Sequence, residues 1–261
     1  MVTAFDARLH MIERQIARIT HFATVHAAVC IAPENPLTPA FPSLHFHVRS
    51  TRRGAPRSNL RNLCGVDTRL SLLEDSLRHR PAGAAARGDD RKEAAVALLL
   101  RARADLELLL IKRAEHERDP WSGHMALPGG RRSLEDADLL ATAFRETEEE
   151  IAVPLKRVGH LLGALDEVAP ANPKLPPIVI APFVVAVPEN TVATANTTEV
   201  DFAVWVPLAS LREPGAAGEI LIQFEGGSRS YPSLRYGEHM IWGLTLRILK
   251  QFFEVVEASG I

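Results

Sequence analysis

A glycine pair followed by a helix dense in glutamate constrains this chain more than any other feature. Gly129 and Gly130 end an apolar segment, and the run R-E-T-E-E-E begins fifteen residues later at Arg145. Residues 136–151 contain no glycine or proline and many good helix formers. The pattern predicts a helix that the chain enters through a glycine turn, where the backbone can approach a ligand closely.

One face of this helix is expected to be apolar. Its residues recur at steps of four, three and four, a spacing that keeps side chains on one side of a helix. They are Leu140, Phe144, Thr147 and Ile151. We expect this face to pack against a core.

Three carboxylates share a different face. Glu146, Glu149 and Glu150 are spaced i, i+3 and i+4, whereas Glu148 points away from them toward solvent. Like charges at this spacing repel by roughly 0.2–0.5 kcal/mol per pair, which a bound cation would relieve. Oxygen ligands without Cys or His favour Mg²⁺ or Mn²⁺ over zinc. The sequence therefore predicts a metal site, with Arg145 one turn before Glu149 and able to pair with it.

Two aspartates lie near the expected helix start. Asp136 and Asp138 are placed where a carboxylate either caps free N–H groups or adds a metal ligand. Capping is the favoured interpretation for both.

These residues resemble the Nudix box, the signature of Nudix hydrolases, which cleave a diphosphate linked to another moiety. Arg145-Glu146 matches the Arg-Glu of that signature, and Glu149-Glu150 matches its Glu-Glu pair. Val153 matches the closing apolar residue.

The match has departures. Thr147 occupies an apolar slot, and Ala152 occupies the late glycine slot. The gap between Gly130 and the Arg-Glu pair is one residue longer than usual, so Ala137 stands at the early glutamate place. Asp136 is the nearest acid, and its role is left open.

The resemblance implies roles for the box residues. Glu149 and Glu150 are expected to be the main metal ligands, and Glu146 to assist them or to polarise the attacking water. The Gly130 carbonyl is an expected extra ligand, and Arg145 is expected to orient the carboxylates.

Within the family, the resemblance is closest to the coenzyme A diphosphatase branch. The run L-L-I-K-R at 109–113, then Arg118, Gly123 and L-P-G-G at 127–130, follows the motif of that branch. The step from Arg118 to Gly123 is one residue longer, and leucine replaces the phenylalanine of F-P-G-G. Lys112, Arg113 and Arg118 are candidates to bind substrate phosphates; surface solvation is the alternative for each.

Other candidate groups lie outside the box. Glu199 opens an expected strand and resembles an acid of the coenzyme A branch, which makes it a candidate base; a loop charge is the alternative. Four aromatic residues are candidates to stack on a base, although core packing in the last helix is favoured for one of them, Trp242. The others are Trp121, Tyr231 and Tyr236. His124 and His239 lack zinc-ligand spacing and are interpreted as structural.

The segments around the glutamate helix predict a mixed fold. Two apolar runs at 94–101 and 106–112 flank A-R-A-D and predict a hairpin. Further strands are expected at 124–127, 158–165, 178–187, 200–206 and 219–224, and helices at 67–80, 207–211 and 238–258. The Nudix resemblance implies an α/β fold of the α+β type, a mixed β-sheet flanked by helices in an α/β/α sandwich. Residues 92–258 are expected to form one catalytic domain.

The first 65 residues differ from the rest. They are rich in arginine and proline and poor in acids, which predicts loop or disorder. Three interpretations remain open: an organelle-targeting peptide, a docking or regulatory arm, and an artefact of an upstream start with initiation near Val66. The last is favoured, with residues 66–91 as an N-terminal helix and linker.

Charge, hydropathy and cysteine content exclude several classes of partner and chemistry. The net charge of −2 gives no general attraction to nucleic acid or to an anionic membrane. No apolar run approaches the roughly 20 residues that span a bilayer. Both cysteines, Cys30 and Cys64, precede the domain, which excludes cysteine nucleophile chemistry at the main site and suits a reducing compartment. We expect a cytoplasmic protein, and the resemblance allows a homodimer.

The expected function is Mg²⁺- or Mn²⁺-dependent hydrolysis of the diphosphate linkage in a small-molecule nucleoside diphosphate conjugate. Coenzyme A or a derivative is the favoured substrate, with NADH, ADP-ribose and nucleoside triphosphates as alternatives. The rival class is a non-catalytic Nudix-fold binding module. Such a module is expected to lose box carboxylates, and the presence of Glu146, Glu149 and Glu150 favours the enzyme.

Overall fold

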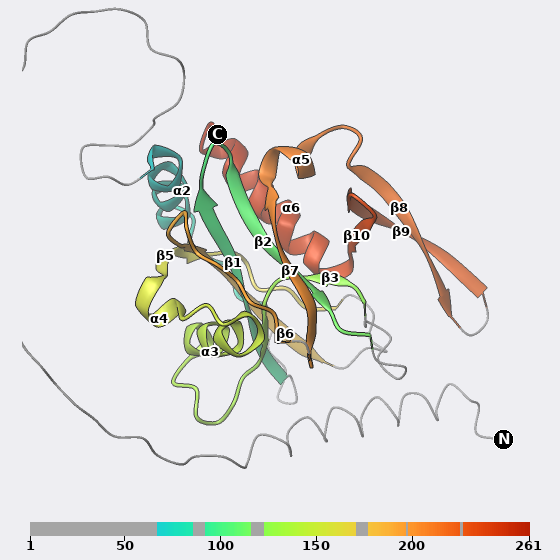
Figure 1. Cartoon of the computed structure of the whole chain (residues 1–261), viewed down its shortest axis with the longest axis horizontal. Helices are drawn as coiled ribbons and strands as arrows, with labels where there is room; N and C mark the ends of the chain where they lie inside the picture. Colours follow the sequence, from blue (N-terminus) through green and yellow to red (C-terminus); the bar gives the residue numbers. More distant parts are fainter. Residues whose placement is uncertain (1–66, 86–91, 116–122, 171–176, 197, 225–226) are drawn as a thin grey trace, which may run out of the picture. The chain divides into compact units, whose positions relative to one another are not determined.

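The computed structural model describes residues 67–85, 92–115, 123–170, 177–196, 198–224 and 227–261 (Figure 1). Expectations for the first 65 residues, for Arg118 and for Trp121 fall outside these residues. Within them, no helix is long and apolar enough to cross a membrane.

The strand β1 (Lys92–Ala102) is the centre of a seven-stranded mixed sheet. It pairs in parallel with β6 (Ile178–Ala186) from Lys92↔Ile178 to Leu100↔Ala186. It also forms the predicted antiparallel hairpin with β2 (Leu106–Arg113). The opposite end of β1 pairs with β4 (Gly129–Arg131), a strand that the sequence suggested only as a turn.

The remaining strands extend the sheet on both sides. β3 (Met125–Ala126) and β7 (Val200–Pro207) pair with β2, and β5 (His160–Ala164) pairs with β6. All three were expected, with boundaries that differ by a few residues.

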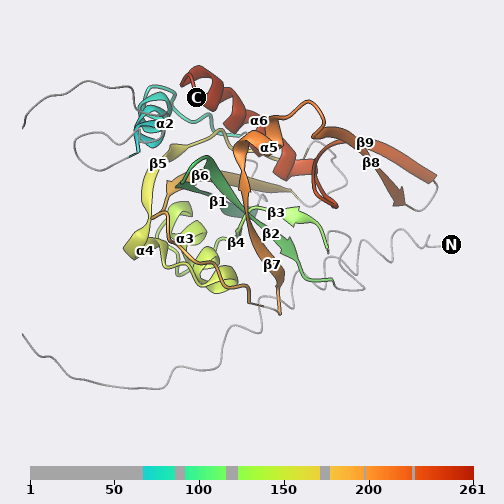
Figure 2. The same cartoon turned by 45° about the horizontal axis from the view of Figure 1, so that its top comes forward.

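Helices cover both faces of this sheet (Figures 1 and 2). Alternate residues of β1 point to opposite faces, and each set belongs to a different buried cluster. Leu98 and Leu100 pack with α2 (Thr68–Arg78) and α6 (Gly243–Ala258). Ala97 and Leu99 pack with α3 (Leu139–Ile151) and α4 (Leu155–Val158). The predicted α/β/α sandwich is confirmed.

The C-terminal third departs from the prediction. The helix expected over 238–258 begins at Gly243, because His239–Trp242 forms β10, which pairs with β9 (Gly227–Tyr236). Gly237 has a φ of +59°, which allows the tight turn between these two strands. The polar sequence of β9 gave no strand signal. β9 also pairs with β8 (Ala217–Phe224), and this hairpin projects from the body of the domain as an arm (Figure 1). The expected short helix is α5 (Leu208–Arg212).

The glutamate helix also differs from its predicted form. It begins at Leu139, with Asp138 as the N-cap residue accepting a hydrogen bond of 2.7 Å from the Ala141 N–H. The buried side includes Ala143, Thr147 and Ile151, whereas Leu140 and Phe144 are only half-buried. Glu150 is buried on this side as well. The buried face of α3 is therefore rotated from the expected apolar face toward the side that carries the carboxylates.

Candidate active site

The start of β4 and the helix α3 meet at two glycines. A Cβ atom at Gly130 would lie 2.4 Å from Oε2 of Glu146, so the carboxylate occupies space that only glycine leaves. Gly129 has a φ of +145° and would place a Cβ 2.2 Å from the Ala95 carbonyl oxygen of β1. The glycine pair thus serves two contacts, one with the helix and one with the central strand.

A backbone hydrogen bond fixes the deepest carboxylate. The Gly129 N–H donates to Oε2 of Glu150 at 2.9 Å, and Glu150 is 4% exposed. This bond joins β4 to the C-terminal half of α3, and it gives the buried carboxylate a partner.

Arg145 is the hub of the exposed side of the site. Its guanidinium lies 2.9 Å from Glu146 and 3.0 Å from Glu149. It also donates to the Arg131 carbonyl oxygen at 3.1 Å. The pairing with Glu149, which the spacing suggested, is present, and the same side chain holds Glu146 too.

Asp136 anchors this hub. Arg145 donates to it twice, through Nε at 3.0 Å and through Nη2 at 2.9 Å. The carboxylate also accepts from the Ser133 N–H at 2.8 Å and the Thr142 hydroxyl at 2.9 Å. The capping expected of both aspartates is therefore right for Asp138 and wrong for Asp136, because Asp136 lies before the helix and turns toward Arg145.

The loop after β6 brings Glu199 to the site. The Thr194 and Asn196 N–H groups donate to the Ile151 and Glu150 carbonyl oxygens at 2.9 and 2.8 Å, which closes the end of α3. Glu199 follows this loop, and its negative charge contributes to the raised pKa of both Glu146 and Glu150. The candidate base thus lies within electrostatic range of two box carboxylates.

The two described basic candidates have different surroundings. The positive charge of Arg113 opposes the raised pKa of Glu150, so Arg113 is within electrostatic range of that carboxylate. Lys112 instead bonds Asp201 at 2.9 Å and lies over the Phe202 ring. The structure brings Arg113 toward the carboxylates and engages Lys112 elsewhere.

Burial and like charges disfavour ionised carboxylates here. Burial raises the pKa of Glu150 to about 8, and the charges of Glu146 and Glu199 act in the same direction. The Gly129 N–H and Arg113 oppose this shift. Burial also raises the pKa of Glu146, against the effect of Arg145.

Within the described ranges, no three acidic, histidine or cysteine side chains converge closely enough to hold a metal ion. Separate donors hold the carboxylates instead: Arg145 binds Glu146 and Glu149, while Gly129 binds Glu150. The donor set itself fits a hard divalent cation, because it supplies only oxygens. Such a cation would also relieve the repulsion that Glu150 experiences.

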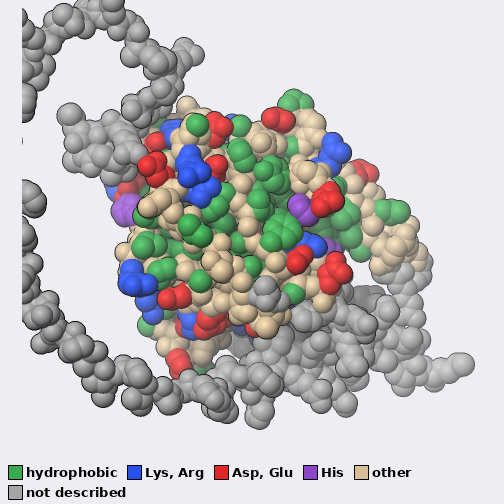
Figure 3. Space-filling model, viewed as in Figure 1, with side chains coloured by type: hydrophobic (Ala, Val, Ile, Leu, Met, Phe, Trp, Pro, Cys, Tyr) green, Lys and Arg blue, Asp and Glu red, His purple; other side chains and the backbone are tan. Residues whose placement is uncertain are grey.

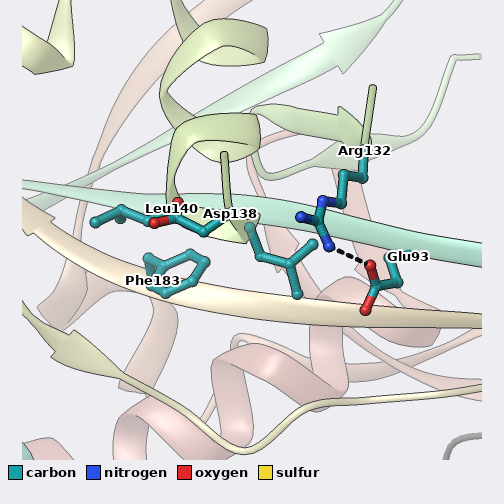
Figure 4. Close-up of a pocket in the computed structure, with 6 residues that line it drawn as sticks. Glu93, Arg132, Asp138, Leu140 and Phe183 are labelled. Atoms are coloured by element: carbon teal, nitrogen blue, oxygen red, sulfur yellow. Dashed lines mark hydrogen bonds and ion pairs between the residues drawn. The ribbon is translucent and has the colours of Figure 1, made fainter. Parts of the chain in front are cut away.

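A separate pocket of about 410 Å³ lies at the other end of α3 (Figure 4). Asp138 and Leu140 line it together with Phe183 of β6, and an ion pair of 2.7 Å between Arg132 and Glu93 crosses one side. None of the box carboxylates lines it, so this pocket is distinct from the site.

Sequence reasoning missed three supports of the site. It did not find the Gly129–Glu150 hydrogen bond, the loop closure by Asn196, or the anchoring role of Asp136. The sequence did single out Asp136 as the acid nearest the early glutamate place, but it gave no sign of the pairing with Arg145.

An acidic helix held against a glycine-containing strand of a mixed sheet is the arrangement that the resemblance to Nudix hydrolases implied. A family model described as NUDIX domain matches residues 90–223, and the chain belongs to the Nudix hydrolase family.

Two curated proteins and one solved structure are similar to this chain. The chain is 34% identical over 165 residues to the Nudix hydrolase NudL of Yersinia pestis, covering 63% of this chain and 80% of NudL. It is 40% identical over 129 residues to an uncharacterized protein of Schizosaccharomyces pombe, covering 48% of this chain and 39% of the length of that protein. A MutT/nudix family protein from Enterococcus faecalis has a similar structure, with 19% identity, a TM-score of 0.45, and coverage of 66% of this chain and 65% of that chain.

Proposed function

We propose that this protein is a divalent-metal-dependent hydrolase that cleaves the diphosphate linkage of a small nucleoside diphosphate conjugate. The observation that carries the proposal is the set of contacts at the glycine pair, where Arg145 holds Glu146 and Glu149 and the Gly129 N–H holds Glu150. Diphosphate hydrolysis needs this kind of site, because crowded negative charge must be neutralised and a water aligned with the phosphorus.

The metal would be held by Glu146, Glu149 and Glu150, with the Gly130 carbonyl as an additional ligand. The donor chemistry favours Mg²⁺ or Mn²⁺. When bound, the ion supplies charge neutralisation and lowers the pKa of a coordinated water.

The protein's own groups then have defined tasks. Arg145 orients Glu146 and Glu149, and Asp136 keeps Arg145 in place through its two hydrogen bonds. Glu149 and Glu150 are the main ligands, and Glu146 assists them or polarises the water. Glu199 is the candidate general base that accepts the proton of the attacking water.

Coenzyme A or a derivative is the favoured substrate. The support is the motif from 109 to 130. Its Arg113 carries a positive charge that lowers the pKa of Glu150. Arg113, together with Lys112 and Arg118, would bind phosphate oxygens, including the additional ribose phosphate of coenzyme A. NADH, ADP-ribose and nucleoside triphosphates are the alternatives within the same reaction class.

The test is turnover of a panel of diphosphate compounds with Mg²⁺ or Mn²⁺, with the products identified by mass spectrometry. Coenzyme A is expected to give phosphopantetheine and adenosine 3′,5′-bisphosphate. The Glu149→Gln and Glu150→Gln variants should each lose activity at least about 100-fold, within the range expected when groups of a catalytic site are removed.

Glu148→Gln is the matched control, because Glu148 lies on the same helix and is exposed. It should retain parental activity. If no compound is turned over and the Gln variants behave like the parent, the protein is a binding module and the enzymatic proposal is wrong.

A further inference from the structure

A row of aromatic rings lies beside the proposed hydrolytic site. The ring of His124 meets Trp242 edge to face, with centroids 5.1 Å apart and an interplanar angle of 79°. Tyr231 follows at 5.6 Å from Trp242, and the Arg229 guanidinium lies 5.4 Å from the Tyr231 ring centroid. We call His124, Trp242 and Tyr231 the ring row.

Backbone hydrogen bonds tie the row to the carboxylate site. The Arg113 N–H donates to the His124 carbonyl oxygen at 3.1 Å, and the Gly123 N–H donates to the Arg113 carbonyl oxygen at 3.1 Å. The next residue, Ala114, donates its N–H to the Glu199 carbonyl oxygen at 2.9 Å, so the row begins one residue from the backbone contact with the candidate base.

The strand geometry of β10 explains why the indole remains accessible. Ile241 is fully buried, and successive side chains of a strand point to opposite faces. Trp242 therefore points away from the core, and it is half-buried, as are His124 and Tyr231. β10 lies beside β3, which places the Trp242 ring against the residue that precedes β3.

Polar groups surround the same region. Figure 3 shows histidine side chains with basic and acidic ones between the main sheet and the β8–β9 arm, next to hydrophobic side chains. A half-buried indole with two ring neighbours presents flat, apolar surface, and the Arg229 guanidinium lies over one of these rings. Flat aromatic ligands are what such a surface binds best, since offset stacking adds to area burial.

We propose that the ring row, with Trp242 at its centre, stacks the nucleobase of the substrate while its diphosphate lies at the carboxylates. The inference rests on the proposed function for the identity of the substrate. It assigns base recognition to the C-terminal strands β9 and β10, outside the segment that carries the glutamates.

The first experiment compares substrates with and without a base. Trp242→Leu should raise the KM for a base-containing diphosphate such as ADP-ribose by roughly tenfold, given the usual strength of base–aromatic stacking. It should leave the KM for the abasic analogue, the diphosphate diester of two ribose 5-phosphates, within twofold of the parent. Trp242→Phe, which keeps a ring, should restore most of the loss.

Trp205→Leu is the matched control. Trp205 lies on β7, and its indole is also half-buried. Its neighbour is the Arg101 guanidinium, 4.2 Å from the ring centroid, and not a member of the ring row. This variant should keep the parental KM for both substrates. Equal effects of Trp205→Leu and Trp242→Leu, or equal effects of Trp242→Leu on both substrates, would overturn the proposal.

The second experiment does not depend on turnover. Titration of the metal-free protein with adenosine 5′-monophosphate should quench tryptophan fluorescence, and ribose 5-phosphate should not. The quenching should vanish in Trp242→Leu and persist in Trp205→Leu. Quenching without hydrolysis would refute the proposed function and leave base stacking by the ring row intact. Hydrolysis without Trp242-dependent quenching would refute base stacking by the ring row and leave the proposed function intact.

Discussion

The carboxylate of Glu146 fills the space that any side chain at Gly130 would need, because a Cβ there would lie 2.4 Å from Oε2. The obstruction is the end of a flexible side chain and can move. At Gly129 the obstruction is the Ala95 carbonyl oxygen of β1, at 2.2 Å, which cannot move without disturbing the sheet. Two adjacent glycines are thus required for different reasons.

Gly130→Ala is expected to damage activity and spare the fold. Displacing the Glu146 carboxylate should lower kcat by roughly 10- to 100-fold, since small misplacements of catalytic groups have effects of this size. The free energy of unfolding should change by less than about 1 kcal/mol. Steady-state kinetics and urea unfolding measure both quantities.

Gly129→Ala provides the contrast. The φ of +145° and the backbone clash together should lower the free energy of unfolding by about 3 kcal/mol or more. If the two alanine variants lose stability equally, the distinction between the glycines is incorrect.

Asp136→Asn should destabilise the protein through Arg145. Asp136 is 6% exposed at its side chain and pairs with Arg145 at 2.9 Å, so neutralising it should lower the free energy of unfolding by about 2 kcal/mol. Asp75→Asn is the control, because the Asp75–Arg78 pair is solvent-exposed and should contribute less than about 1 kcal/mol. Equal losses in the two variants would contradict the anchoring role.

The same ion pair predicts an acid-dependent loss of stability. Hydrogen bonds from Arg145, assisted by the Ser133 N–H and Thr142, lower the pKa of Asp136 from 3.8 to about 2. A carboxyl with a lowered folded-state pKa stabilises the fold above its unfolded pKa and ceases to do so as the pH falls through the folded value. The parent should therefore lose about 2 kcal/mol more than Asp136→Asn between pH 5 and pH 2, as measured by denaturant unfolding across that range.

Glu150→Gln should stabilise the metal-free protein. Since the folded-state pKa is raised from 4.5 to about 8, the parental carboxyl destabilises the fold progressively as the pH rises through this window. The amide oxygen can still accept from Gly129, so at pH 8 with EDTA the variant should gain at least about 1 kcal/mol. Mg²⁺ should raise the melting temperature of the parent and have little effect on the variant. A variant that is less stable in EDTA would refute this account.

Ala152→Gly should increase stability. Ala152 ends α3 with a φ of +55° in the left-handed region, where a Cβ costs roughly 1–2 kcal/mol. Glycine removes this strain and adds unfolded-state entropy, so the net gain should be about 0.5–1 kcal/mol. Ala258→Gly, at an exposed position in the last turn of α6, should instead reduce stability by up to about 1 kcal/mol. Thermal unfolding would distinguish the two, and a loss in both would show that Ala152 is unstrained.

Local pattern predicted much of the fold and less of the site. The β1–β2 hairpin and α3 were predictable because apolar periodicity and turn residues are local signals. The strand β9 was not, because its sequence is polar and its pairing depends on β8 and β10. The burial of Glu150 could not be foreseen, since it depends on a hydrogen bond from a glycine on another element. For the same reason Trp242 was assigned to a helix, although it closes a strand.

The proximity in sequence of β4 and α3 has a consequence for how this domain can diversify. Residues 129–150 provide both glycines and all three box glutamates, whereas the ring row draws Tyr231 and Trp242 from a stretch some eighty residues later. Replacing 217–242 with the corresponding stretch of another family member would exchange ligand preference and leave the hydrolytic groups untouched. Chimeras of this kind would let selectivity evolve, or be engineered, independently of the chemistry.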